Sequence, residues 1–169
     1  MPNAFKVIKP EAIKDSPFSA IGKEGMLITA GSIKRYNMMT ASWGAWGVLW
    51  HRNVCFCFVR PHRYTFTFLE EGDRFTLSFF DKKYKKVLDF CGGCSGREVD
   101  KMERAGLTAV PGGKGVVYFK EARLVIVARK IYHQDILPEN FLDPRIEDNY
   151  PKKDYHRMYV GEVVQCLKK

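Results

Sequence analysis

The chain has 169 residues, of which 46% are hydrophobic and 28% charged, and its formal net charge is +9. This length and hydrophobic content suffice for one domain with a buried core, and they exclude a disordered chain. No apolar run reaches the roughly 20 residues that span a membrane, and the first residues lack the apolar segment of a signal peptide. We therefore expect a cytoplasmic protein with no membrane partner.

Residues 1–24 include three prolines and are predicted to form an irregular lead-in to one domain, which covers residues 25–169. From residue 25 onward, short runs of β-branched and aromatic residues lie between glycine, proline and asparagine breaks, a pattern typical of strands. The first five predicted strands cover residues 26–30, 38–42, 46–50, 54–59 and 74–79.

Two helices are predicted in the middle of the chain, over residues 82–90 and 97–105. Ser95 precedes the second helix and Glu98 follows three residues later, which is the spacing of a capping box. Strands resume after this helix, and many short strands with two helices predict a mainly β fold with α decoration, a β-barrel. The later strands are predicted over residues 115–119, 122–132 and 157–167.

The positive charge is spread along the chain, and its densest run of lysines falls in the first predicted helix, where a solvated helix face explains it. We therefore expect no nucleic-acid partner. A small nucleic-acid-binding barrel stays open as an alternative, because stacking rings beside cations bind single strands. His62, Tyr64 and Phe66 alternate in this way beside Arg60 and Arg63.

The five cysteines are an odd number in a chain without a recognisable export signal, so reduced thiols are expected. Cys91 and Cys94 have the CxxC spacing of redox and metal sites. A structural zinc site needs four ligands, and the sequence has no second CxxC and no nearby histidine pair. We therefore predict no metal, and thiol redox chemistry remains an alternative.

The segment from Asn37 to Gly44 reads NMMTASWG and is the first of three that suit a planar, phosphate-bearing ligand. Thr40 and Ser42 alternate and are predicted to share one strand face, and Ala41 allows close approach. The alternative is a plain strand-to-loop exit with methionines in the core. The candidate residues are Asn37, Met38, Met39, Thr40, Ala41, Ser42 and Trp43.

The second segment, RPHRYT, follows a very apolar strand, so its charges are expected at the end of that strand. Arg60, Arg63 and Thr65 would converge on a phosphate, because guanidinium groups and hydroxyls are good phosphate donors. An exposed basic turn is the alternative.

The third segment, from Gly92 to Arg97, is predicted to be a flexible glycine-rich loop that enters a capped helix. Unpaired backbone N–H groups and Ser95 would form an anion site there, and Lys101 would share the helix face of Arg97. The segment matches neither GxGxxG nor GxxxxGK[ST], so dinucleotide and Walker motifs are absent.

These segments together resemble the flavin reductase-like FMN-binding family, the flavoredoxin-type split barrels. The matches cover residues 37–44, 60–65 and 94–101, and the resemblance extends over about residues 25–164. It implies an FMN-binding split β-barrel, usually a homodimer with flavin near the subunit interface. By this resemblance the first segment lies along the isoalloxazine and ribityl chain, and the other two enclose the phosphate. Residues added to the site in this way are Tyr64, Cys94, Gly96, Arg97 and His156.

The resemblance implies an NAD(P)H-dependent flavin reductase that passes hydride through FMN to an unknown electron acceptor. The cofactor supplies the difficult chemistry, so no catalytic protein residue is expected. The alternative is an FMN-binding electron-transfer or carrier protein without a dedicated nicotinamide site.

Overall fold

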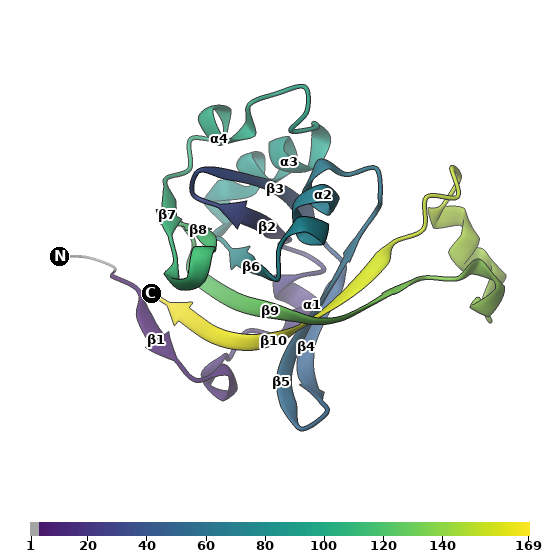
Figure 1. The fold of residues 1–169 in the computed structure, drawn as a ribbon, viewed down its shortest axis with the longest axis horizontal. Coiled ribbons are helices and arrows are strands. Elements are labelled where there is room, and N and C mark those ends of the chain that lie inside the picture. Colours follow the sequence, from purple (N-terminus) through teal and green to yellow (C-terminus); the bar gives the residue numbers. More distant parts are fainter. Residues whose placement is uncertain (1–3) are drawn as a thin grey trace.

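The computed structural model describes residues 4–169, which build one antiparallel sheet of eight strands (Figure 1). The strand order is β3-β2-β6-β9-β10-β5-β4, and β1 pairs with the C-terminal end of β10. The short strands β7 and β8 form a separate pair. The strands are β1 (Lys6–Ile8), β2 (Met26–Ser32), β3 (Arg35–Ala41), β4 (Gly44–Leu49), β5 (Arg52–Val59), β6 (Arg74–Phe79), β7 (Ala109–Pro111), β8 (Val117–Phe119), β9 (Leu124–Asp135) and β10 (Arg157–Lys168).

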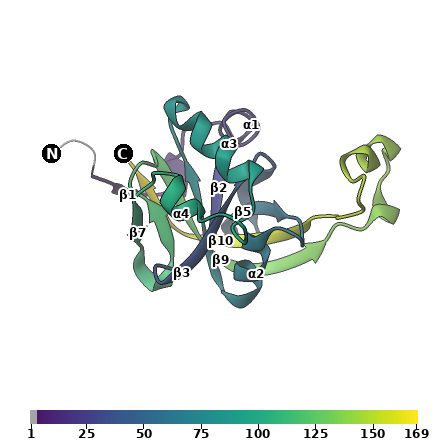
Figure 2. The ribbon, with the colours of Figure 1, turned by 90° about the horizontal axis from the view of Figure 1, so that it is seen from above.

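In the described part of the chain, four α-helices and several 3₁₀ turns surround the sheet, and α2, α3 and α4 gather near β2 and β3 (Figures 1 and 2). Among residues 4–169, no helix is long and apolar enough to cross a membrane. The α-helices are α1 (Pro17–Ala20), α2 (Tyr64–Glu71), α3 (Lys85–Gly93) and α4 (Lys101–Arg104). The 3₁₀ turns are Pro10–Ala12, Lys82–Tyr84, Gly113–Gly115, Pro138–Asn140 and Pro144–Asn149.

Each strand predicted from the sequence is present, β6 with the predicted ends and the others with shifted ends, which confirms the mainly β fold with α decoration. The irregular lead-in predicted over residues 1–24 is wrong in part. Its described residues include β1, which pairs with β10 and places Lys6 opposite Lys168, and the short helix α1. Three residues of that segment, 1–3, lie outside the described part of the chain.

Strands β2 and β3 each contribute side chains to two hydrophobic cores, because successive side chains of a strand point to opposite faces of the sheet. Ile28 and Met39 belong to the inner core, which the strands of the main sheet enclose. Leu27 and Met38 belong to the second core, where they are buried together with Leu88 of α3. The strand that carries the predicted ring-binding segment is therefore packed on both faces.

Helix α2 was not predicted, because its residues alternate threonine and phenylalanine as a strand does. In the structure Tyr64 contacts Phe68 one turn later, with ring centroids 5.0 Å apart, and Phe68 is buried in the inner core. Arg63 occupies the N-cap of α2, and Thr65 lies in its first turn. Residues 60–63 form a turn, in which the Arg63 N–H donates to the Arg60 carbonyl at 3.0 Å, and this turn leads directly into α2.

The helix predicted over residues 97–105 is shorter and begins later. The Asp100 carboxylate accepts a hydrogen bond from the Glu103 backbone N–H at 3.1 Å, so Asp100 is the N-cap of α4. Ser95 instead begins a turn, in which its Oγ accepts from the Arg97 N–H at 3.2 Å. The predicted capping box of Ser95 and Glu98 is therefore wrong, because Asp100 caps the helix that forms.

The flexible glycine-rich loop predicted before this helix is also partly wrong. Helix α3 continues to Gly93, so Gly92 and Gly93 form its last turn. Glycine at position 92 lets α3 approach β3 closely, since a Cβ there would lie 3.2 Å from the Thr40 Cβ. Only residues 94–100 connect α3 to α4.

A long excursion, residues 136–156, separates β9 from β10 and is called the arm below. It projects away from the sheet in Figure 1 and returns beside the ends of β3 and β5. The Ile136 backbone N–H donates to the His156 carbonyl at 2.9 Å, which closes the base of the arm. Phe141, Tyr150 and Tyr155 pack on one another inside it, with ring centroids 4.9 to 6.1 Å apart.

Candidate functional site

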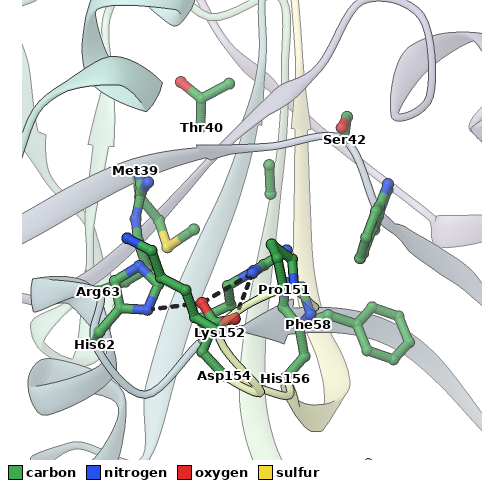
Figure 3. A pocket seen from close by; sticks show the side chains of 13 residues that line it. Met39, Thr40, Ser42, Phe58, His62, Arg63, Pro151, Lys152, Asp154 and His156 are labelled. Carbon is green, nitrogen blue, oxygen red and sulfur yellow. Dashed lines mark hydrogen bonds and ion pairs between the residues drawn. The ribbon is translucent and has the colours of Figure 1, made fainter. Parts of the chain in front are cut away.

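An open cavity of about 440 Å³ lies where the ends of β3 and β5 meet the arm (Figure 3). Its wall combines the predicted ring-binding segment with the start of the RPHRYT segment and the last residues of the arm. The lining residues are Met39, Thr40, Ala41, Ser42, Trp43, Phe58, Arg60, His62, Arg63, Pro151, Lys152, Asp154 and His156.

A smaller pocket of about 190 Å³, the inner pocket, adjoins the open cavity at His62 and Arg63, which line both. It lies between β3, the start of α2 and the residues that join α3 to α4. The predicted phosphate-binding segments therefore meet in space. The lining residues are Asn37, His62, Arg63, Tyr64, Thr65, Gly92, Gly93, Cys94, Ser95, Gly96 and Lys101.

Two cations, Arg63 and Lys101, reach the inner pocket without a carboxylate partner among residues 4–169. Arg63 Nη1 donates to the Gly92 carbonyl at 3.1 Å, and its Nη2 is buried with no hydrogen-bond partner. Lys101 is 1% exposed, and its Nζ donates to the carbonyls of Met38 at 3.2 Å and Cys91 at 2.8 Å. Among residues 4–169, the pocket thus holds one buried and one half-buried positive charge, and both donate hydrogen bonds to backbone carbonyls only.

Burial shifts the titration of both cations. It lowers the pKa of Arg63, and it lowers the pKa of Lys101, to which the charge of Arg63 contributes in the same direction. An anion bound in the inner pocket would offset both effects, because a nearby negative charge favours the protonated form of each group. The pocket therefore fits the phosphate of the cofactor expected from the sequence.

Asn37 and Gly96 complete the floor of the inner pocket. Asn37 Nδ2 donates to Thr65 Oγ1 at 2.8 Å, and its Oδ1 is buried without a partner. A Cβ at position 96 would lie 2.1 Å from this Oδ1, so only glycine permits the observed packing. The family resemblance at Gly96 therefore reflects the close approach of the backbone at residue 96 to Asn37 of β3.

Two residues expected in the site lie behind it. The Met38 side chain is buried in the second core, and only its carbonyl faces Lys101. The Arg97 guanidinium donates to the His62 carbonyl at 2.8 Å and lies 4.8 Å from the centroid of the Tyr64 ring. In this structure Arg97 supports the turn that carries His62 and Arg63.

Thr40 and Ser42 line the open cavity in different ways. Thr40 Oγ1 donates to the Leu88 carbonyl of α3 at 2.5 Å, and its side chain points away from Asp154 in Figure 3. Ser42 follows the last residue of β3 and is exposed. The shared strand face predicted for the two hydroxyls is therefore wrong, because β3 ends between them.

Arg60 faces the arm, so it does not join Arg63 in the inner pocket. Its Nη1 lies 2.8 Å from both carboxylate oxygens of Asp154, and its Nη2 donates to the Asn149 carbonyl at 2.9 Å. The guanidinium also lies 5.0 Å from the centroid of the Tyr150 ring. The Nδ1 of His62 lies 3.2 Å from the same carboxylate, and Figure 3 shows His62 beside Asp154. Both arginines line the open cavity, but only Arg63 also lines the inner pocket, so their convergence on one phosphate stays a prediction.

We expect the variant Arg60→Gln to loosen the arm. The Arg60–Asp154 contact is partly buried and charge-assisted, so its loss would favour local opening of the arm by about 1.5 kcal/mol. Cleavage by trypsin at Lys152 and Lys153 should become roughly tenfold faster under native conditions. Arg35→Gln is the control, because it removes an exposed pair with Glu71. Equal cleavage rates in the two variants would show that Arg60 does not hold the arm.

His156 closes the open cavity beside Trp43. It is 8% exposed, its Nδ1 is 2.8 Å from the Tyr150 hydroxyl, and its ring centroid is 5.0 Å from that of Trp43. Burial, followed by the charge of Arg60, lowers the pKa of His156 to about 4. The imidazole is therefore neutral at pH 7 and serves as a hydrogen-bonding group.

Sequence reasoning missed several lining residues of the open cavity, chiefly Phe58, Pro151, Lys152 and Asp154. Phe58 belongs to a strand that reads as fully buried, and the others follow a stretch without a regular pattern. Asp154 lies between two lysines and two ring residues, and nothing in that pattern indicates Arg60 as its partner.

The sequence matches the model of the flavin reductase like domain over residues 18–168. The chain belongs to the flavin reductase-like family. This match confirms the family expected from the three segments, and it also covers the arm and all of α1 except Pro17. No curated protein matches this flavin reductase-like chain significantly in sequence.

Solved structures of similar fold agree with this assignment. Flavoredoxin from Methanosarcina acetivorans superposes with a TM-score of 0.68 at 22% identity, over 86% of this chain and 68% of that one. An FMN-binding protein from Thermus thermophilus gives 0.68 at 21% identity, over 98% and 80%. An NADH:FAD oxidoreductase from Streptomyces globisporus gives 0.66 at 16% identity, over 86% and 74%. At these identities the similarity establishes the fold, and the predicted split-barrel class is confirmed.

Proposed function

We propose that this flavin reductase-like protein is an FMN-binding oxidoreductase, with the phosphate in the inner pocket and the ring system in the open cavity. One observation carries the proposal: a buried cation, Lys101, and a half-buried one, Arg63, have no carboxylate partner among residues 4–169, and they adjoin a cavity lined by the segment that resembles the family's ring-binding segment. Bound FMN would accept a hydride and release it to the electron acceptor. Similar structures include FMN-binding proteins, which supports this choice of ligand.

The residues of the chain would bind and orient this cofactor. Arg63 and Lys101 would hold the phosphate, and two residues with hydroxyl groups, Thr65 and Ser95, line the same pocket. Met39, Ala41, Ser42 and Trp43 would lie along the ring, and Trp43 is fixed against the imidazole of His156. Arg60 would act through the arm, which forms one wall of the open cavity.

We further propose NADH or NADPH as the hydride donor. The similar fold of an NADH:FAD oxidoreductase determined with NAD and FAD fragments supports it, as does the open side of the cavity. Positioning of the donor against the flavin is the main task of the protein in such a reaction. A homodimeric assembly and a cytoplasmic location stay predictions.

An FMN carrier or electron-transfer protein is the second candidate. The superposition with flavoredoxin favours it, and we identify no side-chain set among residues 4–169 that recognises a nicotinamide. The two candidates differ in one property, which is the rate of reduction by a nicotinamide nucleotide.

The visible absorbance spectrum of the purified protein tests the proposal. We expect flavin bands with one FMN per chain and bleaching of those bands by NADH or NADPH without oxygen. Stable bands in the presence of both nucleotides would favour the carrier. Failure of the colourless protein to take up added FMN would contradict both candidates.

A further inference from the structure

Cys94 differs from the other cysteines of the chain in its surroundings. Cys55, Cys57, Cys91 and Cys166 are buried, whereas Cys94 is partly exposed and lines the inner pocket. It follows the last residue of α3, where its Sγ donates a hydrogen bond to the Phe90 carbonyl at 3.2 Å. A reagent that enters the inner pocket therefore meets one thiol.

The charges that face this thiol are positive. Arg63 and Lys101 line the same pocket, and neither has a carboxylate partner among residues 4–169. Thiol–disulfide exchange proceeds through the thiolate, which is the nucleophilic form of cysteine. The Cys91 thiol is buried and stays protonated, because burial raises its pKa to about 11.

Unpartnered polar atoms in the pocket indicate a ligand independently of the thiol. Asn37 is 1% exposed. Its Oδ1 and the buried Nη2 of Arg63 have no hydrogen-bond partner among residues 4–169. Arg63 and Lys101 suit a negatively charged group of a small ligand, and Asn37 Oδ1 suits a hydrogen-bond donor next to that charge. The pocket can therefore concentrate anionic molecules beside Cys94.

We propose that Cys94 is a site of thiol–disulfide exchange with small anionic disulfides, and that an anion bound in the inner pocket protects it. The Cys94 thiolate attacks one sulfur of the disulfide, and a new sulfur–sulfur bond forms as the old one breaks. The other half leaves as a thiolate with the bonding electron pair, and the Cys94 proton goes to water. The adduct places its own negative group where the phosphate would bind.

The inference rests on the proposed function only for protection by FMN, since the reactivity follows from the pocket alone. The flavin-free protein would be treated with two disulfides, the dianionic 5,5′-dithiobis(2-nitrobenzoate) and the neutral 4,4′-dithiodipyridine. Modified sites would be located by peptide mass mapping, with Cys94→Ser as the unreactive reference. Each reaction would be repeated with inorganic phosphate and with FMN.

We expect one equivalent of modification, at Cys94, and protection by phosphate. In Arg63→Gln the anionic reagent should react at least roughly tenfold more slowly while the neutral reagent changes little, because only the former is attracted by charge. Protection by phosphate but not by FMN would keep this inference and reject the proposed placement of FMN. Three results would overturn the inference: modification of other cysteines first, a Cys91–Cys94 disulfide as the product, or equal slowing of both reagents.

Discussion

Replacing Lys101 with methionine is expected to weaken FMN binding by roughly 10- to 150-fold, which corresponds to about 1.5–3 kcal/mol for a charged hydrogen bond. Lys101 is 1% exposed and has no carboxylate partner among residues 4–169, so a bound phosphate would be its main counter-charge. The free energy of unfolding of the flavin-free protein should change much less. Removal of a buried charge offsets the loss of hydrogen bonds to the carbonyls of Met38 and Cys91.

Titration with FMN and with riboflavin, which lacks the phosphate, separates this effect from general damage. We expect the preference for FMN over riboflavin to fall in Lys101→Met and to fall further when Arg63→Gln is added. Lys86→Met is the matched control, since Lys86 is exposed on α3 and its loss changes the net charge equally. An equal loss of affinity for both flavins would contradict the placement of the phosphate in the inner pocket.

The second large effect is a loss of stability in acid that originates at His156. In the folded protein the pKa of His156 is about 4, whereas its ordinary value is 6.5. Between these values the unfolded chain binds a proton that the folded chain does not, so the free energy of unfolding falls as the pH falls. We expect a decrease of about 2–3 kcal/mol between pH 7 and pH 4.5.

Urea denaturation at several pH values measures this decrease, and His156→Gln is the informative comparison because it removes the titrating ring. The variant should show a much flatter profile over the same range. The groups that surround the ring are Tyr150, Arg60, Asp154 and His62, and all four are retained in the variant. A profile as steep as that of the parent protein would assign the acid sensitivity to other groups.

The sequence contained enough information to find the strands and the segments of the site. Strand predictions succeeded because apolar and aromatic runs are bounded by turn residues. The site segments were found because hydroxyls, arginines and glycines cluster at strand ends, and the family resemblance placed them in one site. Their convergence on the inner pocket could not be derived from spacing, since Asn37, Thr65 and Lys101 lie on three separate elements.

The features that could not be predicted from the sequence depend on contacts between residues that are far apart along the chain. Arg60 was expected to bind phosphate, but its partner Asp154 lies 94 positions away on a segment without a regular pattern. The capping-box prediction failed because the same spacing occurs in a turn, while Asp100 caps the true helix. Helix α2 was missed because burial of Phe68 and Leu69 outweighs the alternating pattern of its residues.

The arm also has a consequence for how this domain can diverge. Its two ends are joined by the hydrogen bond from the Ile136 N–H to the His156 carbonyl, next to the first paired residues of β9 and β10. Insertions or deletions between these ends would leave the register of the sheet intact, because a change in loop length costs little free energy. The segment that walls the open cavity can therefore be exchanged independently of the inner pocket, so substrate choice can evolve while retention of the cofactor is conserved.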